Sequence, residues 1–278
     1  MSRIQELELA SSTNSLDRHL HADPAVNQVP LAFLEGVRER PERYPLGVRA
    51  IAAMNEDETI GVAMQRLPYD PIVSRCPEEI AERLGGSYRD RFPDIQGAHG
   101  PESLARAFAR GAGASRTSLR VKMAQGLFRL DTVAEIPEAP GRARATDPAD
   151  AATLLAWLRA FAAEAVPDDP APEDEAGERL ATSGRCWIWE LEDGTPVSFV
   201  NNIRRIPGLW AISPVYTPPE HRGHGYASSA VAFLSRYALA QGAEACTLFT
   251  DLANATSNRI YERIGYRRID TFTSLGWD

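Results

Sequence analysis

The feature that most constrains this chain is a short glycine-rich loop between a predicted strand and a predicted helix. Residues 222–227 read Arg-Gly-His-Gly-Tyr-Ala, and an apolar pattern of helical period follows them as far as Gly242. Two glycines let the backbone turn tightly and direct several N–H groups into one concavity, and the helix adds the positive end of its dipole. The sequence therefore predicts an anion site suited to a diphosphate, with Arg222 as a charged donor at its rim.

Two other kinds of glycine-rich loop do not fit these residues. A Walker loop requires Gly-Lys followed by Ser or Thr, whereas Gly225 precedes Tyr226 here. A dinucleotide-binding fingerprint requires three spaced glycines at the start of a βαβ unit, and this loop has two and follows a predicted meander. Both are excluded. A plain turn between strand and helix remains open when the loop is taken alone.

The second half of the chain has a clear order of predicted elements. Asp147 and Pro148 form a helix start before residues 149–165. Three antiparallel strands then follow, in which apolar and β-branched runs are separated by turn residues. After the glycine loop come a helix, a buried strand, a short helix and a last strand. The predicted ranges are 186–191, 196–203 and 209–216 for the meander, then 227–240, 245–250, 254–264 and 267–273.

The first half is less regular but also predicts α/β structure. Residues 48–54 and 59–66 form a predicted hairpin, Pro77 and Pro101 each precede a predicted helix, and residues 116–130 are extended. A segment rich in proline and glycine indicates a linker. We therefore expect an N-terminal α/β domain at 1–134, a linker at 135–146 and a second domain at 147–278. The similar order of elements leaves open whether the first domain is a diverged copy of the second.

Composition limits the partners. The formal net charge is −8, which disfavours a nucleic acid backbone and favours a cationic or neutral substrate. No apolar run is long enough to span a bilayer and no secretory signal is evident, so we expect a cytoplasmic protein without a membrane partner. The three cysteines lack metal-ligand spacing, so no metal site is predicted. The sequence predicts no oligomeric state.

Residues 222–227 match the motif Gln/Arg-x-x-Gly-x-Gly/Ala, and this part of the chain resembles the GCN5-related N-acetyltransferase (GNAT) family. The downstream residues are similar to the second cofactor motif of that family: Asn254, Ser257, Asn258, Ile260, Tyr261, Gly265 and Tyr266. The resemblance covers residues 147–273 and is strongest over 210–266. It implies a mixed α/β fold with a mainly antiparallel, twisted sheet flanked by helices.

The resemblance also implies an acyl-coenzyme A site without a metal. In this family the strand before the loop diverges from its neighbour, and its free edge pairs with the pantetheine arm of the cofactor. The positions implied are Val215, Tyr216 and Thr217 on the strand, Arg222, Gly223, His224, Gly225, Tyr226 and Ala227 in the loop, and Asn254, Ser257 and Asn258 beyond it. Asn254 could equally be an ordinary helix N-cap.

Two residues are predicted to act in catalysis. The resemblance implies that Tyr261 protonates the departing thiolate, which a phenol with a pKa of roughly 10 could do. Glu164 shares a helix face with Trp157 and Phe161 and is a candidate general base, although a helical carboxylate is also a common surface group. The expected activity is direct transfer of an acyl group, with acetyl favoured, from acyl-coenzyme A to a small-molecule or peptide amine. The alternative is a non-catalytic acyl-coenzyme A sensor or interaction module.

Overall fold

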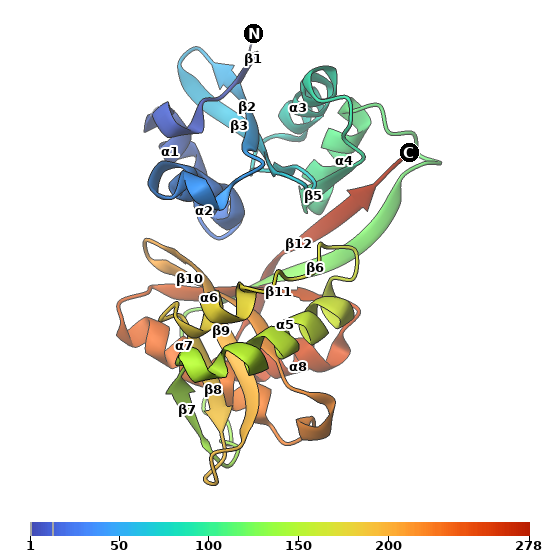
Figure 1. The fold of residues 1–278 in the computed structure, drawn as a ribbon. Helices are drawn as coiled ribbons and strands as arrows, with labels where there is room; N and C mark the ends of the chain where they lie inside the picture. The colour runs from blue at the N-terminus through green and yellow to red at the C-terminus, as the bar shows by residue number, and fades with distance from the viewer. Residues whose placement is uncertain (1, 13) are drawn as a thin grey trace. The chain divides into compact units, whose positions relative to one another are not determined.

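The computed structural model describes residues 2–12 and 14–278, which divide into two compact units (Figure 1). Unit 1 comprises Met1–Leu127 and Ile269–Asp278, and unit 2 comprises Phe128–Arg268. Each unit is a mostly antiparallel sheet with helices packed against it. The predicted α/β fold class is therefore confirmed.

Unit 1 has the strand order β1-β2-β3-β4-β5-β12. Its pairs are antiparallel except β4 with β5, which run parallel. Helices α3 and α4 bury an apolar face in a core that also contains Leu275 and Trp277. The elements are β1 (Arg3–Glu6), α1 (Asn14–His21), α2 (Gln28–Glu39), β2 (Val48–Asn55), β3 (Glu58–Arg66), β4 (Ile72–Val73), α3 (Glu78–Arg91), β5 (Gly97–Pro101), α4 (Glu102–Gly111), β6 (Arg120–Leu130) and β12 (Arg267–Gly276).

Unit 2 has the strand order β7-β8-β9-β10-β11, with the end of β6 beside β11. Successive side chains of a strand point to opposite faces, and the core follows this rule. Trp187 packs with α7 and α8 on one face, whereas Ile188 packs with α5 on the other. The elements are β7 (Arg142–Ala145), α5 (Ala151–Ala165), α6 (Ala176–Ala181), β8 (Cys186–Glu190), β9 (Pro196–Ile206), β10 (Leu209–Tyr216), α7 (Tyr226–Ala240), β11 (Ala245–Asp251) and α8 (Ala255–Ile264).

The two units repeat one topology. In each, a first strand is followed by two helices, a three-stranded meander, a helix, a strand paired in parallel with the third meander strand, and a further helix. The sixth strand is β12 in unit 1 and the end of β6 in unit 2. The two units therefore have the same order of elements.

The boundaries of the units differ from the predicted 1–134, 135–146 and 147–278. The predicted linker belongs to unit 2, because β7 pairs with β8 in register from Arg142↔Glu190 to Ala145↔Trp187. Upstream of β7, the Ala139 N–H donates to Ser229 Oγ of α7 at 2.8 Å. The last ten residues also belong to unit 1 rather than to the C-terminal domain. Long-range pairing overrides the local proline and glycine signal here.

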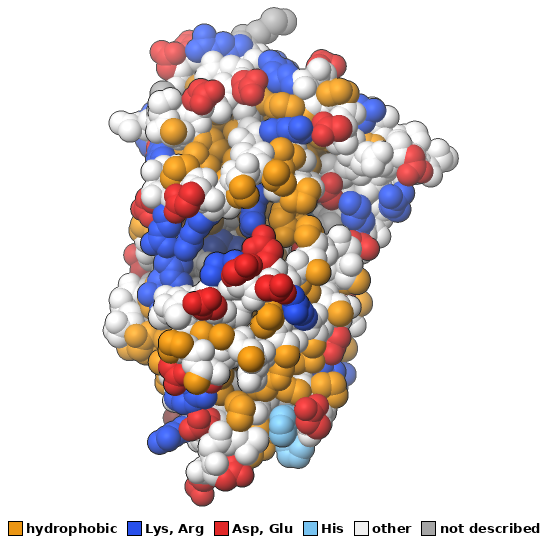
Figure 2. Space-filling model, in the orientation of Figure 1, with side chains coloured by type: hydrophobic (Ala, Val, Ile, Leu, Met, Phe, Trp, Pro, Cys, Tyr) orange, Lys and Arg blue, Asp and Glu red, His pale blue; other side chains and the backbone are white. Residues whose placement is uncertain are grey.

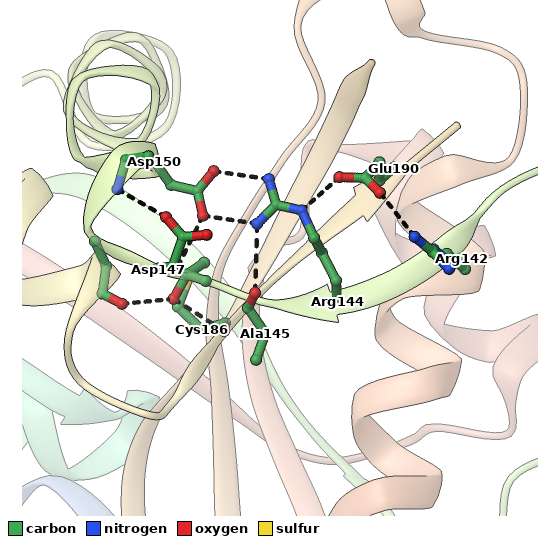
Figure 3. A network of polar contacts seen from close by, with 10 residues as sticks. Arg142, Arg144, Ala145, Asp147, Asp150, Cys186 and Glu190 are labelled. Carbon is green, nitrogen blue, oxygen red and sulfur yellow. Dashed lines mark hydrogen bonds and ion pairs between the residues drawn. The ribbon is translucent and has the colours of Figure 1, made fainter. Parts of the chain in front are cut away.

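An ion network fixes α5 to the sheet (Figure 3). Arg144 of β7 donates to both carboxylate oxygens of Asp150, at 2.7 and 2.8 Å, and its Nε donates to Glu190 of β8. Asp147 and Asp150 form a capping box immediately before α5, as the predicted helix start requires. The network thus determines where α5 begins, and α5 leads to Glu164.

Candidate functional site

Strands β10 and β11 pair over only part of their length. Their parallel ladder joins residues 209–211 to 245–247, although β10 continues to Tyr216 and β11 to Asp251. On its other side, β10 remains paired with β9 as far as Tyr216↔Phe199. Beyond the ladder, the β11-facing edge of β10 can pair with an extended ligand instead of a strand.

The glycine loop leaves β10 and ends at α7. Gly223 and Gly225 have φ values of +83° and +84°, in the left-handed region that side chains with a Cβ adopt only with strain. Gly225 directly precedes α7 as its N-cap and, as a glycine, has no side chain that could cap the first turn of that helix. The first N–H groups of a helix have no partner within it, and the helix dipole makes this end positive. Backbone donors are thus available to an anion.

Two of the predicted strand positions have their carbonyl groups engaged. Ser198 Oγ donates to the carbonyl of Tyr216 at 2.9 Å, and Arg222 Nε donates to the carbonyl of Thr217 at the same distance. Thr217 Oγ1 also donates to Ser198 Oγ. Ser198 is fully buried, and the sequence offered no sign of its role because an alternating strand pattern predicts only its face. These bonds fix the end of β10, where Val215 is half-buried.

The predicted phosphate donor and the predicted base contact each other. Arg222 Nη2 lies 2.9 Å from Oε1 and 2.8 Å from Oε2 of Glu164. The guanidinium also lies over the ring of Tyr216, 5.6 Å from its centroid, and the Tyr216 hydroxyl donates to Glu164 Oε1 at 3.3 Å. Burial, and then the charge of Glu164, raise the pKa of Tyr216. The sequence placed these residues at one site but could not predict the ion pair.

The remaining loop residues have distinct surroundings. His224 is exposed and stacks on Tyr226, with ring centroids 5.5 Å apart. Tyr226 is buried in the core of unit 2, and Ala227 is half-buried in the first turn of α7. His224 Nδ1 contacts the carbonyl of His221 at 3.3 Å. Besides the side chain of Arg222, the exposed parts of the loop are therefore the backbone of its glycines and the imidazole of His224.

The start of α8 gives Asn254 the capping role that the sequence left open. Its side chain accepts from the Ser257 N–H at 3.0 Å, so the side chain of Asn254 is occupied as an N-cap. Asn258 donates to the carbonyls of Asp251 and Leu252 at 3.3 and 3.2 Å. Its Oδ1 is buried and has no partner among the described residues. A buried acceptor without a donor is costly, so this oxygen is suited to an N–H group of a ligand.

Tyr261 lies on α8 in an apolar setting. It packs into the core formed by α7, α8 and the sheet, and its ring meets that of Tyr266 edge to face at 6.0 Å. Burial raises the pKa of Tyr261 to about 12. The hydroxyl therefore stays protonated at neutral pH but is a weaker acid than the free phenol assumed from the sequence. It can donate a hydrogen bond, and full proton transfer requires a strongly basic acceptor.

The described residues include neither a membrane span nor a metal cluster. Over residues 2–12 and 14–278, no helix combines the length and the apolar character needed to cross a bilayer. Within the same ranges, no group of three or more His, Cys, Asp or Glu side chains is arranged to hold a metal ion. On the face drawn in Figure 2, acidic and basic side chains lie beside each other.

Part of the chain matches a known protein family. Residues 151–266 match the model of the acetyltransferase (GNAT) family. That segment contains β10, the glycine loop, α7, β11 and α8. A search of curated proteins gave no match.

Solved structures resemble the whole chain. A GNAT-family acetyltransferase from Colwellia psychrerythraea has 13% identity and a TM-score of 0.59, with 99% of this chain and 100% of that chain covered. A GCN5-related N-acetyltransferase from Sphaerobacter thermophilus has 16% identity and a TM-score of 0.65, with 99% and 94% covered. A tandem GNAT protein of the clavulanic acid biosynthesis pathway has 14% identity and a TM-score of 0.63, with 99% and 98% covered. At these identities the likeness shows the fold, and the fold extends over both units.

Proposed function

We propose that this chain transfers an acyl group from an acyl-coenzyme A to an amine, and the match of residues 151–266 to the acetyltransferase (GNAT) family model supports this. The observation that supports this most directly is the ladder of β10 and β11, which ends at Ala211↔Thr247 beside a glycine loop and an uncapped helix start. An acyl-coenzyme A has an extended amide-bearing arm and a diphosphate. The open strand edge suits the arm, and the loop suits the diphosphate.

The proposed cofactor contacts follow from this arrangement. The N–H groups from Gly223 to the first turn of α7 would bind the diphosphate. The edge of β10 near Val215 would pair with the pantetheine amides. The orphan Oδ1 of Asn258 would accept from one of their N–H groups. Acetyl is the acyl group we favour, since the family model is that of acetyltransferases.

The proposed chemistry is direct attack without a covalent enzyme intermediate. The nitrogen of the amine attacks the thioester carbon, a C–N bond forms and the C–S bond breaks. An acceptor that arrives as an ammonium ion loses two protons, of which one ends on the sulfur and one reaches solvent. We propose that Tyr261 donates to the departing sulfur and that Glu164 receives a proton from the ammonium group. A backbone N–H near Val215 would polarise the thioester carbonyl.

Two observations favour the rival function, a non-catalytic acyl-coenzyme A sensor. The raised pKa of Tyr261 makes it a weak acid, and Glu164 is paired with Arg222. A sensor would bind the thioester and leave it intact. An enzyme would release free thiol when a suitable amine is present.

Thiol release separates the two functions. Purified protein is given acetyl-coenzyme A and a panel of primary amines, amino acids and peptide N-termini, and free thiol is followed spectroscopically. We expect turnover with at least one amine and a fall in kcat of about 10²-fold or more in Tyr261→Phe, with coenzyme A affinity retained. Tyr237→Phe, which changes another half-buried tyrosine of unit 2, serves as the matched control. Tight binding without turnover in the wild type would establish the sensor.

A further inference from the structure

The ion pair between Glu164 and Arg222 brings together two groups with separate proposed tasks. Glu164 lies in the last turn of α5, and Arg222 is the first residue of the glycine loop. With Nη2 on both carboxylate oxygens and Nε on the carbonyl of Thr217, the guanidinium is turned toward α5. While this pair persists, the carboxylate offers no net charge to an ammonium ion.

The pair is open to competition. The side chains of Arg222 and Glu164 are 47% and 48% exposed. Ion pairs at this exposure contribute only about 0–1 kcal/mol to stability, because water screens them and two long side chains must be ordered. A diphosphate bound at the start of α7 has at least two negative charges and prefers the planar guanidinium geometry. It is therefore a stronger partner for Arg222 than one half-exposed carboxylate.

We propose that the diphosphate of a bound acyl-coenzyme A binds Arg222 and so breaks the ion pair between Arg222 and Glu164. The freed carboxylate of Glu164 then binds the ammonium group of the acceptor. This inference rests on the proposed function and names its substrate class, an amine that arrives as a cation. Half-buried Trp157 and Phe161 precede Glu164 on the same helix, and Tyr216 presents its hydroxyl to the carboxylate. The acceptor would thus meet one negative charge beside aromatic rings, and only after the cofactor has bound.

Unit 1 contains a related ion pair at the corresponding position, and this pair has a structural role only. Arg75 follows β4 and donates through Nε to Asp23 at 3.4 Å, as Arg222 follows β10 and binds Glu164. However, a second carboxylate, Asp270, also accepts from Arg75. Only residues 74–77 separate β4 from α3, and they include no glycine. Arg75 has two acidic partners and no phosphate loop, so no exchange is expected there.

The affinity for coenzyme A distinguishes exchange from simple bracing of the loop. If the cofactor must displace Glu164, then Glu164→Gln removes the competitor, and coenzyme A should bind about two- to fivefold more tightly by calorimetry. If the pair only braces the loop, the same change weakens binding or leaves it unaltered. Arg222→Gln should weaken binding about tenfold. In the double variant the Glu164→Gln substitution should have no further effect, and Arg75→Gln is the matched control.

The KM for the acceptor amine provides a second, separate test. For the amine with the highest turnover in the panel above, Glu164→Gln should raise KM at least tenfold, while a neutral hydroxylamine-type acceptor should be nearly unaffected. Weaker or unchanged coenzyme A binding in Glu164→Gln, or an equal effect on cationic and neutral acceptors, overturns the inference and leaves the proposed function standing. Absence of coenzyme A binding in the wild type would instead refute the proposed function.

Discussion

Replacing Arg144 by Gln should destabilise unit 2 substantially. Asp150 is 10% exposed in its side chain and Arg144 is 28% exposed, and two hydrogen bonds join them. Removing one partner of a buried pair costs about 3–5 kcal/mol, because the other charge remains buried and unpaired. Because Arg144 is partly exposed, we expect the free energy of unfolding to fall by about 3 kcal/mol, at the low end of this range. For a domain of this size the Tm should then fall by roughly 6–12 °C.

Arg142→Gln is the matched control. Arg142 lies on the same strand, but its side chain is 78% exposed and its contact with Glu190 is 3.4 Å long. We expect Arg142→Gln to lower the free energy of unfolding by no more than about 1 kcal/mol. Both variants are compared with the wild type by calorimetric melting. Equal Tm values for the two variants would refute the reasoning, since burial would then have no bearing on the cost.

The pH dependence provides a second check on the same variant. Hydrogen bonding by Arg144 lowers the pKa of Asp150 below its usual value. A carboxyl with a depressed folded pKa contributes stability above its unfolded pKa of about 3.9, and this contribution is lost as the pH falls. The gap in stability between wild type and Arg144→Gln should therefore be full at pH 7 and should narrow as the pH approaches 3. A gap that is constant over this range would contradict the assigned cause.

Three further outcomes are expected. Gly225→Ala should weaken coenzyme A binding about tenfold. Gly194→Ala changes a glycine with a similar φ of +85° in the β8–β9 turn, so it should cost a similar amount of stability, roughly 1–2 kcal/mol, and leave binding unchanged. Equal coenzyme A affinity in the two variants would contradict the role of the glycine loop in binding. Burial lowers the pKa of His19, so the folded chain should lose stability as the pH falls through about 6.5, and His19→Gln should remove this dependence in calorimetric melts. Because the pKa of Tyr261 is about 12, kcat should not fall between pH 8 and 10 through loss of its proton, and an alkaline decline near pH 10 that Tyr261→Phe abolishes would contradict this.

The sequence predicted those parts of the molecule that local signals determine. Alternating apolar runs, the Asp147–Pro148 helix start and the glycines before α7 each act within a few residues, and the corresponding elements are confirmed. Local signals in the segment 135–146 did not predict β7, because the pairing of β7 with β8 joins residues more than forty positions apart. The Glu164–Arg222 pair was missed for the same reason. Both residues were singled out by their chemical type, but only the tertiary fold places them within 3 Å.

The position of the last strand has a consequence for the order in which the protein is made. Residues 272–276 of β12 pair with β5, and Leu275 and Trp277 are almost wholly enclosed in the core of unit 1. A chain leaving the ribosome therefore completes the N-terminal unit only after residues 269–278 have emerged. Until then, a sheet edge and an apolar surface of unit 1 stay open, and these are features that attract chaperones. Unit 2 contains all of its own sequence from residue 128 to 268 and can close first.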